Sequence, residues 1–241
     1  MKTRGLKQQT RPAALKHLSR AASFRARRDH AAFDRLARRR RLSIDSARTL
    51  GRRLVSDIPS PPKPMRILAI SGSLRRASTN TAALEALARL APEGARVLLY
   101  RDLASLPPFN PDDDIEDKPK PEPVDTLRAL VDASDALVIA APEYAHGLPG
   151  ALKNALDWLV ASETFAGKPT ALLNTSPRAF HAQASLREIL STMAARLIPE
   201  AFVSISLTGK LVTLEDILAD TVCARRLGES LEALIAATRS G

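Results

Sequence analysis

The stretch with the densest set of hydrogen-bonding side chains covers residues 67–80, ILAISGSLRRASTN. A short apolar run ends in a Gly-Ser turn, hydroxyl, guanidinium and amide groups follow, and a helical pattern begins near Ser78. A turn between a strand and a helix directs backbone N–H groups and a helix N-terminus to one point, where a phosphate can bind. The loop lacks a Walker A or dinucleotide pattern, since Gly72 is its only glycine. It predicts a site for a monophosphate ester, with an ordinary serine-capped helix start as the alternative.

A second unusual loop, residues 142–147, follows the apolar run 136–140 and reads PEYAHG. Tyr144 offers an aromatic platform, and backbone N–H and C=O groups suit the hydrogen-bonding edge of a flat heterocycle. His146 could donate a proton to a bound molecule, because an imidazole titrates near neutral pH. The alternatives are that Tyr144 belongs to the core, that Glu143 is solvated and that His146 is an ordinary loop histidine.

Strands and helices must hold these loops in place. Short apolar runs typical of strands buried on both faces alternate with helical patterns from residue 66 onward. We expect strands at residues 66–70, 97–100, 136–140, 169–173 and 201–207. We expect helices after Ser78, from Val124, after Pro149, over residues 186–197 and over residues 214–238. The proline-rich, acidic stretch 102–123 is expected to be an irregular, solvated loop, with a divalent cation site at its acidic cluster as the alternative.

Five strands separated by helices predict an α/β fold, with helices on both faces of an open parallel sheet. In such sheets, ligands bind beyond the carboxyl ends of the strands, where the strand order reverses. For five strands in the order 2-1-3-4-5, that point lies between the first and the third strand. The two loops described above follow those two strands, so we expect one crevice between them.

The charge of the 241-residue chain is divided unevenly. Residues 1–65 carry 18 Lys+Arg against 4 Asp+Glu, whereas residues 66–241 carry 18 against 22. We expect a basic extension over residues 1–64, disordered or partly helical and ending in a proline-rich linker, and one domain over residues 65–241. The extension could bind nucleic acid or an anionic surface, or it could be a targeting segment. A further alternative is that it is upstream sequence without a fold, and that the working protein begins at Met65.

Composition argues against other classes. The single Cys223 excludes an internal disulfide framework, and four histidines without a Cys/His cluster argue against a metal site. No apolar run approaches the roughly 18–20 residues that a bilayer span requires, so we expect no transmembrane segment. We expect a cytoplasmic protein, because its cysteine content is compatible with a reducing compartment.

The two loops resemble the NADPH-dependent FMN reductase family of flavodoxin-like proteins, which includes flavin, quinone, azo-dye and chromate reductases. The resemblance rests on GSLRRASTN after the first strand and PEYAHGLPGALKNALDWL after the third, and it covers residues 66–235. It implies a flavodoxin-like three-layer sandwich with a five-stranded parallel sheet in the order 2-1-3-4-5. It also implies FMN as cofactor and NADPH or NADH as co-substrate.

The resemblance implies three groups of cofactor-binding residues. The FMN phosphate would be held by Ser73, Arg75, Ser78, Thr79 and Asn80. The isoalloxazine ring would be framed by Pro142, Glu143, Tyr144, Ala145, His146 and Gly147. Ser176 and Arg178 would close the flavin edge. Two departures from the family pattern bear on acceptor preference: Ala145 stands where many members have Asn, and bulkier residues replace a Gly-rich loop at 176–181.

The implied reaction passes hydride from NAD(P)H via bound FMN to a flavin, quinone, azo or metal-oxyanion acceptor. The flavin would supply the chemistry, so no catalytic acid or base is obligatory, with His146 as the candidate proton donor. The alternatives are a flavodoxin-like electron carrier without turnover of its own, and a reductase tethered to nucleic acid or a membrane by the basic arm. Family members are commonly dimers or tetramers, so we expect a homodimer or homotetramer. The candidate contact surface is helix 151–160 with Trp158, unless Trp158 belongs to the core.

Overall fold

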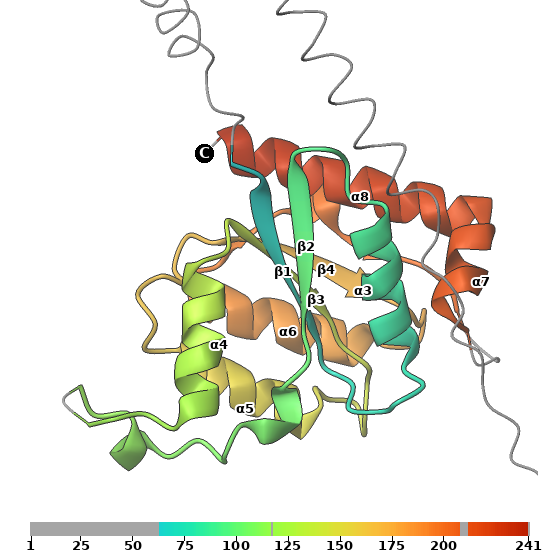
Figure 1. Ribbon diagram of the computed structural model, residues 1–241. Helices are drawn as coiled ribbons and strands as arrows, with labels where there is room; N and C mark the ends of the chain where they lie inside the picture. The colour runs from blue at the N-terminus through green and yellow to red at the C-terminus, as the bar shows by residue number, and fades with distance from the viewer. Residues whose placement is uncertain (1–62, 117, 208–211, 241) are drawn as a thin grey trace, which may run out of the picture. The chain divides into compact units, whose positions relative to one another are not determined.

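The computed structural model describes residues 63–116, 118–207 and 212–240 (Figure 1). The described residues form one parallel sheet, in the order β2-β1-β3-β4-β5, and β6 also pairs with β4. The strands are β1 (Met65–Ser71), β2 (Ala95–Tyr100), β3 (Ala136–Ala140), β4 (Pro169–Asn174), β5 (Arg196–Leu197) and β6 (Val203–Ser204). The predicted strand order is confirmed. The predictions for the basic arm lie outside the described residues, except at its last two positions.

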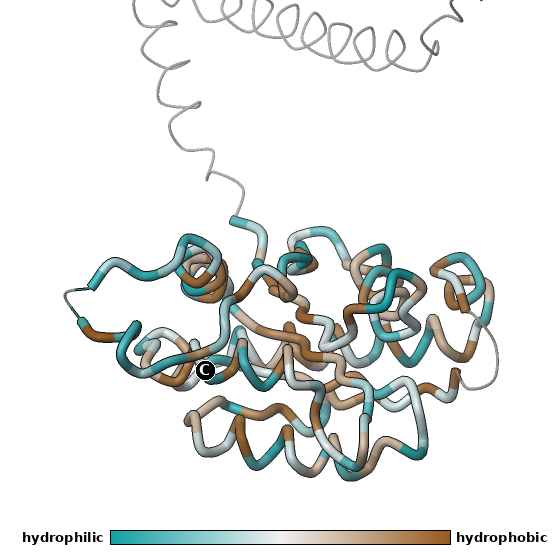
Figure 2. The backbone as a smooth tube through the Cα atoms, turned by 90° about the horizontal axis from the view of Figure 1, so that it is seen from below, coloured by the Kyte–Doolittle hydropathy of each residue, from teal (hydrophilic) through white to brown (hydrophobic). Residues whose placement is uncertain are grey.

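Helices cover both faces of the sheet and make three layers (Figure 1). One face carries α3 (Thr79–Arg89) and α8 (Thr221–Ser240), with α7 (Leu214–Ala219) beside them. The other face carries α4 (Glu122–Asp132), α5 (Gly150–Leu159) and α6 (Phe180–Thr192). The apolar residues concentrate along the strands in the middle of the domain (Figure 2). The predicted three-layer α/β sandwich is confirmed.

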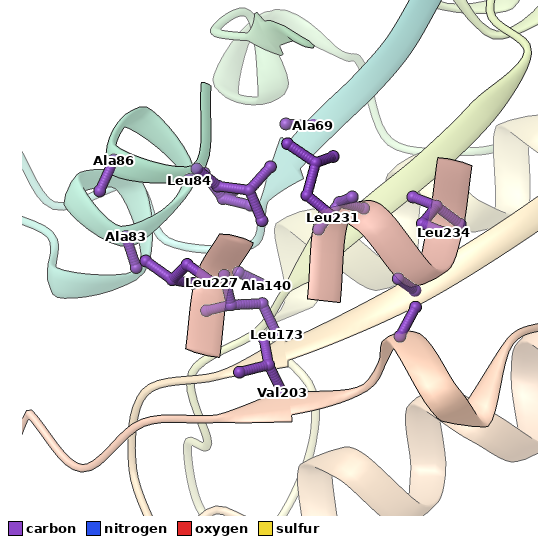
Figure 3. Close-up of a cluster of buried hydrophobic side chains, with 14 of the residues drawn as sticks. Ala69, Ala83, Leu84, Ala86, Ala140, Leu173, Val203, Leu227, Leu231 and Leu234 are labelled. Carbon is purple, nitrogen blue, oxygen red and sulfur yellow. The ribbon is translucent and has the colours of Figure 1, made fainter. Parts of the chain in front are cut away.

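The central strands contribute to a separate core on each face. Ile67 and Ala69 of β1 pack on the side of α3 and α8, whereas Leu68 and Ile70 pack on the opposite side. Figure 3 shows the first core, where leucines of α3 and α8 gather around small and apolar residues of the strands. Each leucine removed from water contributes about 1.5–3 kcal/mol. Because both faces of the strands are buried, the central strands are continuous apolar runs in the sequence.

The last third of the domain differs from the prediction. The strand expected at 201–207 is reduced to the two residues of β6, and β5 lies earlier, at the end of the helix expected over residues 186–197. A 3₁₀ helix, Pro199–Ala201, separates β5 from β6, because Pro199 has no N–H for a ladder. The helix expected to reach residue 197 ends at Thr192, and Ala194 then takes a φ of 58°. The closing helix breaks at Asp220, whose carboxylate accepts the N–H groups of Val222 and Cys223 at the start of α8.

The stretch 102–123 is more ordered than predicted. It contains two 3₁₀ helices, Leu103–Ser105 and Pro111–Asp113. The Asp114 side chain is only 7% exposed and pairs with Arg128 of α4 at 2.7 Å. Arg128 also donates to the carbonyl oxygen of Trp158 at 2.6 and 3.0 Å, which ties the loop to α4 and α5. The expectation that this acidic stretch is simply solvated is therefore wrong for Asp114.

Trp158 anchors the same loop from α5. Its side chain is 0% exposed, its Nε1–H donates to Pro107 O at 2.8 Å, and its ring meets Phe109 edge-on at 5.0 Å. Asn154, one turn earlier, donates to the same carbonyl at 2.9 Å. The core alternative is confirmed, so Trp158 is not available as a contact with another subunit. Among the helices that the structure describes, none is long and apolar enough to cross a membrane.

Lys168 connects the end of α4 to the start of β4, and its replacement by Met is expected to lower the free energy of unfolding by about 1–2 kcal/mol. Its Nζ donates to the carbonyl oxygens of Val131 and Ser134, both at 2.7 Å, and burial lowers the pKa of its ammonium group. The variant loses both bonds. Urea denaturation measures the change in the free energy of unfolding. Lys153→Met is the control, because it removes only the exposed ion pair with Asp157 on α5, and its free energy of unfolding should stay within about 0.5 kcal/mol of the wild type.

Candidate functional site

Three loops surround a cavity of about 160 Å³ beyond the carboxyl ends of β1, β3 and β4. The loops after β1 and β3 leave the sheet at the same end (Figure 1). The lining residues are Ser73, Arg75, Ser78, Thr79, Asn80, Pro142, Tyr144, Thr175, Ser176 and Leu207. The cavity lies at the point where the strand order reverses, so the predicted crevice is present.

The start of α3 supplies hydrogen-bond donors to this cavity. Ser78 is the N-cap, and its Oγ accepts the N–H of Thr81 at 3.2 Å, as predicted for a serine cap. Within the described part of the chain, the backbone N–H groups of Thr79 and Asn80 make no hydrogen bond. Arg75 lines the same cavity, so the lining combines the partial positive charge of the helix start with the full positive charge of an arginine. Such a donor set is suited to an anion.

The turn before α3 is fixed by close packing. The Gly72 N–H donates to Ala140 O at 2.7 Å, which joins the end of β1 to the end of β3. A Cβ at Gly72 would lie 2.8 Å from Cδ2 of Leu152 in α5, so a larger residue would displace the turn or the helix. Ser71 Oγ and Thr81 Oγ1 lie 2.8 Å apart and hold the turn to the first turn of α3.

Asn80 connects α3 to the loop after β4. Its Oδ1 accepts the hydroxyl hydrogen of Thr175 at 3.1 Å, and both residues are buried. Thr175 and Leu207 line the cavity but were not predicted as site residues. The polar run that ends at Ser176 was a usable signal for Thr175, whereas nothing in the sequence pattern distinguishes Leu207.

The loop after β3 contains a tight turn. The N–H groups of Tyr144 and Gly147 donate to each other's carbonyl oxygens at 3.1 and 3.0 Å, and the two residues between them have positive φ angles of 48° and 58°. Positive φ at both central positions is typical of a type I′ turn. Pro142 and Tyr144 line the cavity, and Tyr144 is 50% exposed. Of the predicted residues in this loop, Glu143, Ala145, His146 and Gly147 do not line it.

Replacing Ala145 by Asn is expected to raise the free energy of unfolding by about 1 kcal/mol. The left-handed conformation is costly for most side chains, whereas asparagine adopts it more readily. Urea denaturation of the variant would measure the gain. Ala133→Asn is a matched control, because Ala133 is also exposed but has an ordinary φ of −68°, so no gain is expected there. An equal effect in both variants would contradict the explanation.

His146 and Arg178, also predicted as site residues, are not among the residues that line the cavity. The rings of His146 and His181 are stacked with their centroids 4.4 Å apart. The ring centroid of Phe180, a residue that is 63% exposed, lies 4.1 Å from that of His181. Arg178 is exposed and does not line the cavity, although its N–H donates to Ser176 Oγ at 3.4 Å. The proton-donor role of His146 stays a prediction.

A second cavity of about 240 Å³ lies on the other side of the β1–α3 loop. Arg75 lines both cavities, whereas Arg76 and Arg101 line only the second. Burial, followed by the charge of Asp102, raises the pKa of Tyr100 in this wall to about 12, so its hydroxyl is neutral at physiological pH. Arginine side chains therefore line the cavities on both sides of the β1–α3 loop.

Comparison with known proteins agrees with this arrangement. Residues 65–209 match the family model of NADPH-dependent FMN reductase. The chain is 34% identical over 175 residues to NAD(P)H-dependent FMN reductase PA1204 of Pseudomonas aeruginosa, covering 70% of this chain and 93% of that protein. It is 34% identical over 146 residues to a quinone reductase of Pseudomonas putida, covering 56% and 76%.

Among solved structures, the flavoenzyme NAD(P)H:(acceptor) oxidoreductase FerB from Paracoccus denitrificans superposes with a TM-score of 0.59 at 26% identity. The superposition covers 73% of this chain and 98% of FerB. The family match spans more than half of the chain and includes the loops after β1, β3 and β4 that surround the cavity. On this basis the chain belongs to the NADPH-dependent FMN reductase family, oxidoreductases that use FMN and NAD(P)H.

Proposed function

We propose that this protein transfers reducing equivalents from NAD(P)H, through FMN held at the β1–β3 switch point, to a small oxidant of the quinone type. The observation that carries the proposal is the cavity itself. It combines unpaired N–H groups at the start of α3, the Arg75 guanidinium and the half-exposed ring of Tyr144 in one opening. The names of the relatives, an FMN reductase and quinone reductases, support the same reaction.

The residues present fit FMN. A terminal phosphate monoester carries nearly two negative charges and accepts several hydrogen bonds, which Arg75, Ser73 and the N–H groups at the start of α3 can donate. Pro142 and Tyr144 would provide an apolar wall for a flat ring, and the hydroxyls of Thr175 and Ser176 would meet its polar edge. When bound, FMN supplies the hydride and electron chemistry, and the protein binds and orients it.

The rim suggests which acceptors would fit. Tyr144, in the loop after β3, and Phe180, the first residue of α6, both have exposed rings, and aromatic side chains favour flat, conjugated molecules. We therefore place quinones first among the acceptors and azo dyes second. Metal oxyanions, which have no flat apolar surface, would depend on the exposed Arg178 instead.

The test is spectroscopic and kinetic. The purified full chain, supplied with FMN, should show a flavin absorption spectrum, and rapid mixing with NADPH or NADH should bleach it. Steady-state rates with a quinone, an azo dye, a free flavin and chromate would then rank the acceptors. Failure to bind FMN would end the proposal, and binding without rapid bleaching would favour an electron carrier.

We also propose a homodimer or homotetramer in the cytoplasm, with any binding of nucleic acid limited to residues 1–64. Size-exclusion chromatography with light scattering would give the oligomeric state. Deleting residues 1–64 should leave FMN binding and reduction rates unchanged while removing any affinity for nucleic acid. Loss of folding in that variant would show that the domain boundary is placed wrongly.

A further inference from the structure

Helix α6 begins without a capping side chain of its own. Ala179 occupies the N-cap position and makes no side-chain bond, and the first turn holds no acidic residue. The first N–H groups of a helix need acceptors from outside it. Glu143, from the loop after β3, supplies one, because its Oε2 accepts the N–H of Ala182 at 2.9 Å. A carboxylate is the group that a helix N-terminus favours.

A second contact joins the same two segments. The imidazole of His146 is stacked on that of His181 with the planes only 24° apart. His146 keeps a φ of 58°, which non-glycine residues adopt infrequently. Strained backbone of this kind persists where the surrounding contacts hold it, and it is concentrated at functional sites. The ring stack and the Glu143 carboxylate both connect the turn after β3 to the first turn of α6.

Glu143 lies between two residues that line the cavity. Pro142 precedes it and Tyr144 follows it, while its carboxylate is bonded to the helix that follows Ser176. The Ala179 N–H donates to Ser176 O at 3.1 Å, so Ser176 is attached to the start of α6. A shift of α6 would therefore move Ser176 relative to Tyr144. The capping bond connects one wall of the cavity to the other.

We propose that Glu143 is a positioning residue that sets the separation of the Tyr144 and Ser176 walls by capping α6 from across the cavity. Its carboxylate does not itself contact the flavin, which differs from the ring-framing role that the family resemblance implies. The stacked His146–His181 pair supports the same connection. The link to cofactor binding depends on the proposed function, whereas the capping itself does not.

The first part of the test uses the protein without FMN. Hydrogen-exchange mass spectrometry on peptides covering residues 178–184 should show exchange about tenfold faster in Glu143→Ala than in the wild type. Glu143→Gln keeps an oxygen acceptor and should restore much of the protection. Glu188→Ala is the control, because Glu188 is an exposed glutamate in the same helix whose side chain makes no hydrogen bond within the described residues. Unchanged exchange in Glu143→Ala would overturn the capping role.

The second part measures the dissociation constant of FMN by quenching of its fluorescence. Glu143→Ala should weaken binding about fivefold, with Glu143→Gln intermediate and Glu188→Ala unchanged. His181→Ala should also weaken FMN binding, because it removes the ring stack with His146 while leaving Glu143 in place. Faster exchange in Glu143→Ala with an unchanged dissociation constant would overturn the connection between the cap and the cavity. If the wild type does not bind FMN, the proposed function fails, and the exchange result still decides the capping role.

Discussion

Replacing Arg75 by Ala is expected to weaken FMN binding roughly thirtyfold, which corresponds to about 2 kcal/mol. Arg75 is the one basic residue among the described residues that line the cavity. The free N–H groups of Thr79 and Asn80 at the start of α3 line the same cavity and also favour an anion. A guanidinium bonded to a phosphate makes charge-assisted hydrogen bonds, which are about twice as strong as neutral ones. Fluorescence titration of the apoprotein with FMN would measure the loss.

The neighbouring arginine provides the control. Arg76 has the same charge and is also exposed, but it lines only the second cavity. Arg76→Ala should therefore change the FMN dissociation constant less than threefold. The defect of Arg75→Ala should be smaller with riboflavin, which has no phosphate. Equal losses in the two variants would indicate a general effect of charge rather than a phosphate contact, and would contradict the assignment.

Replacing Trp158 by Ala is expected to lower the free energy of unfolding by about 4 kcal/mol. Its side chain is fully buried, contacts Phe109 and donates to Pro107 O, so the variant loses a large apolar surface and a hydrogen bond and leaves a cavity. This is close to the whole stability of many domains, since typical values are about 5–15 kcal/mol. We expect Trp158→Ala to be largely unfolded at 37 °C or to unfold at low urea concentration.

Trp158→Phe separates the two contributions. It keeps an aromatic ring but leaves Pro107 O without the indole donor, so the expected loss is about 1–2 kcal/mol. Circular dichroism is the measurement in both variants, because Trp158 is the only tryptophan of the chain. In the wild type, its fluorescence should shift to longer wavelength on unfolding. If Trp158→Ala or Trp158→Phe kept its stability but changed the oligomeric state, Trp158 would have to contact another subunit, contrary to its buried position.

The sheet could be predicted because its central strands are buried on both faces. Each of β1, β3 and β4 is an apolar run bounded by a turn, and the expected bounds differ from the observed ones by one residue at most. The cavity could be predicted for a related reason. In a parallel sheet, the loops after the strands lie at one end, so Ser73 and Tyr144 had to come near each other once the strand order was known.

Other features depend on contacts that no local pattern contains. The carboxylate of Glu143 looked available for a ligand, but it is bonded to the backbone of Ala182. Asp114 looked solvated, although it pairs with Arg128. In both cases the partner is distant in sequence, and a charged side chain in a loop gives no sign of where its partner lies. Thr175 was missed although it stands in a polar run after β4, because its bond to Asn80, distant in sequence, is what places it in the site.

The shortness of β5 and β6, which both pair with β4, has a consequence for solubility at high concentration. An outer strand exposes backbone N–H and C=O groups that can pair with a strand of another molecule and start aggregation. Here β5 and β6 are two residues long each, and Pro199 lies between them. A foreign strand therefore finds no continuous row of backbone groups on this side of the sheet. The irregularity that made this segment difficult to predict is also a protection against edge-to-edge association.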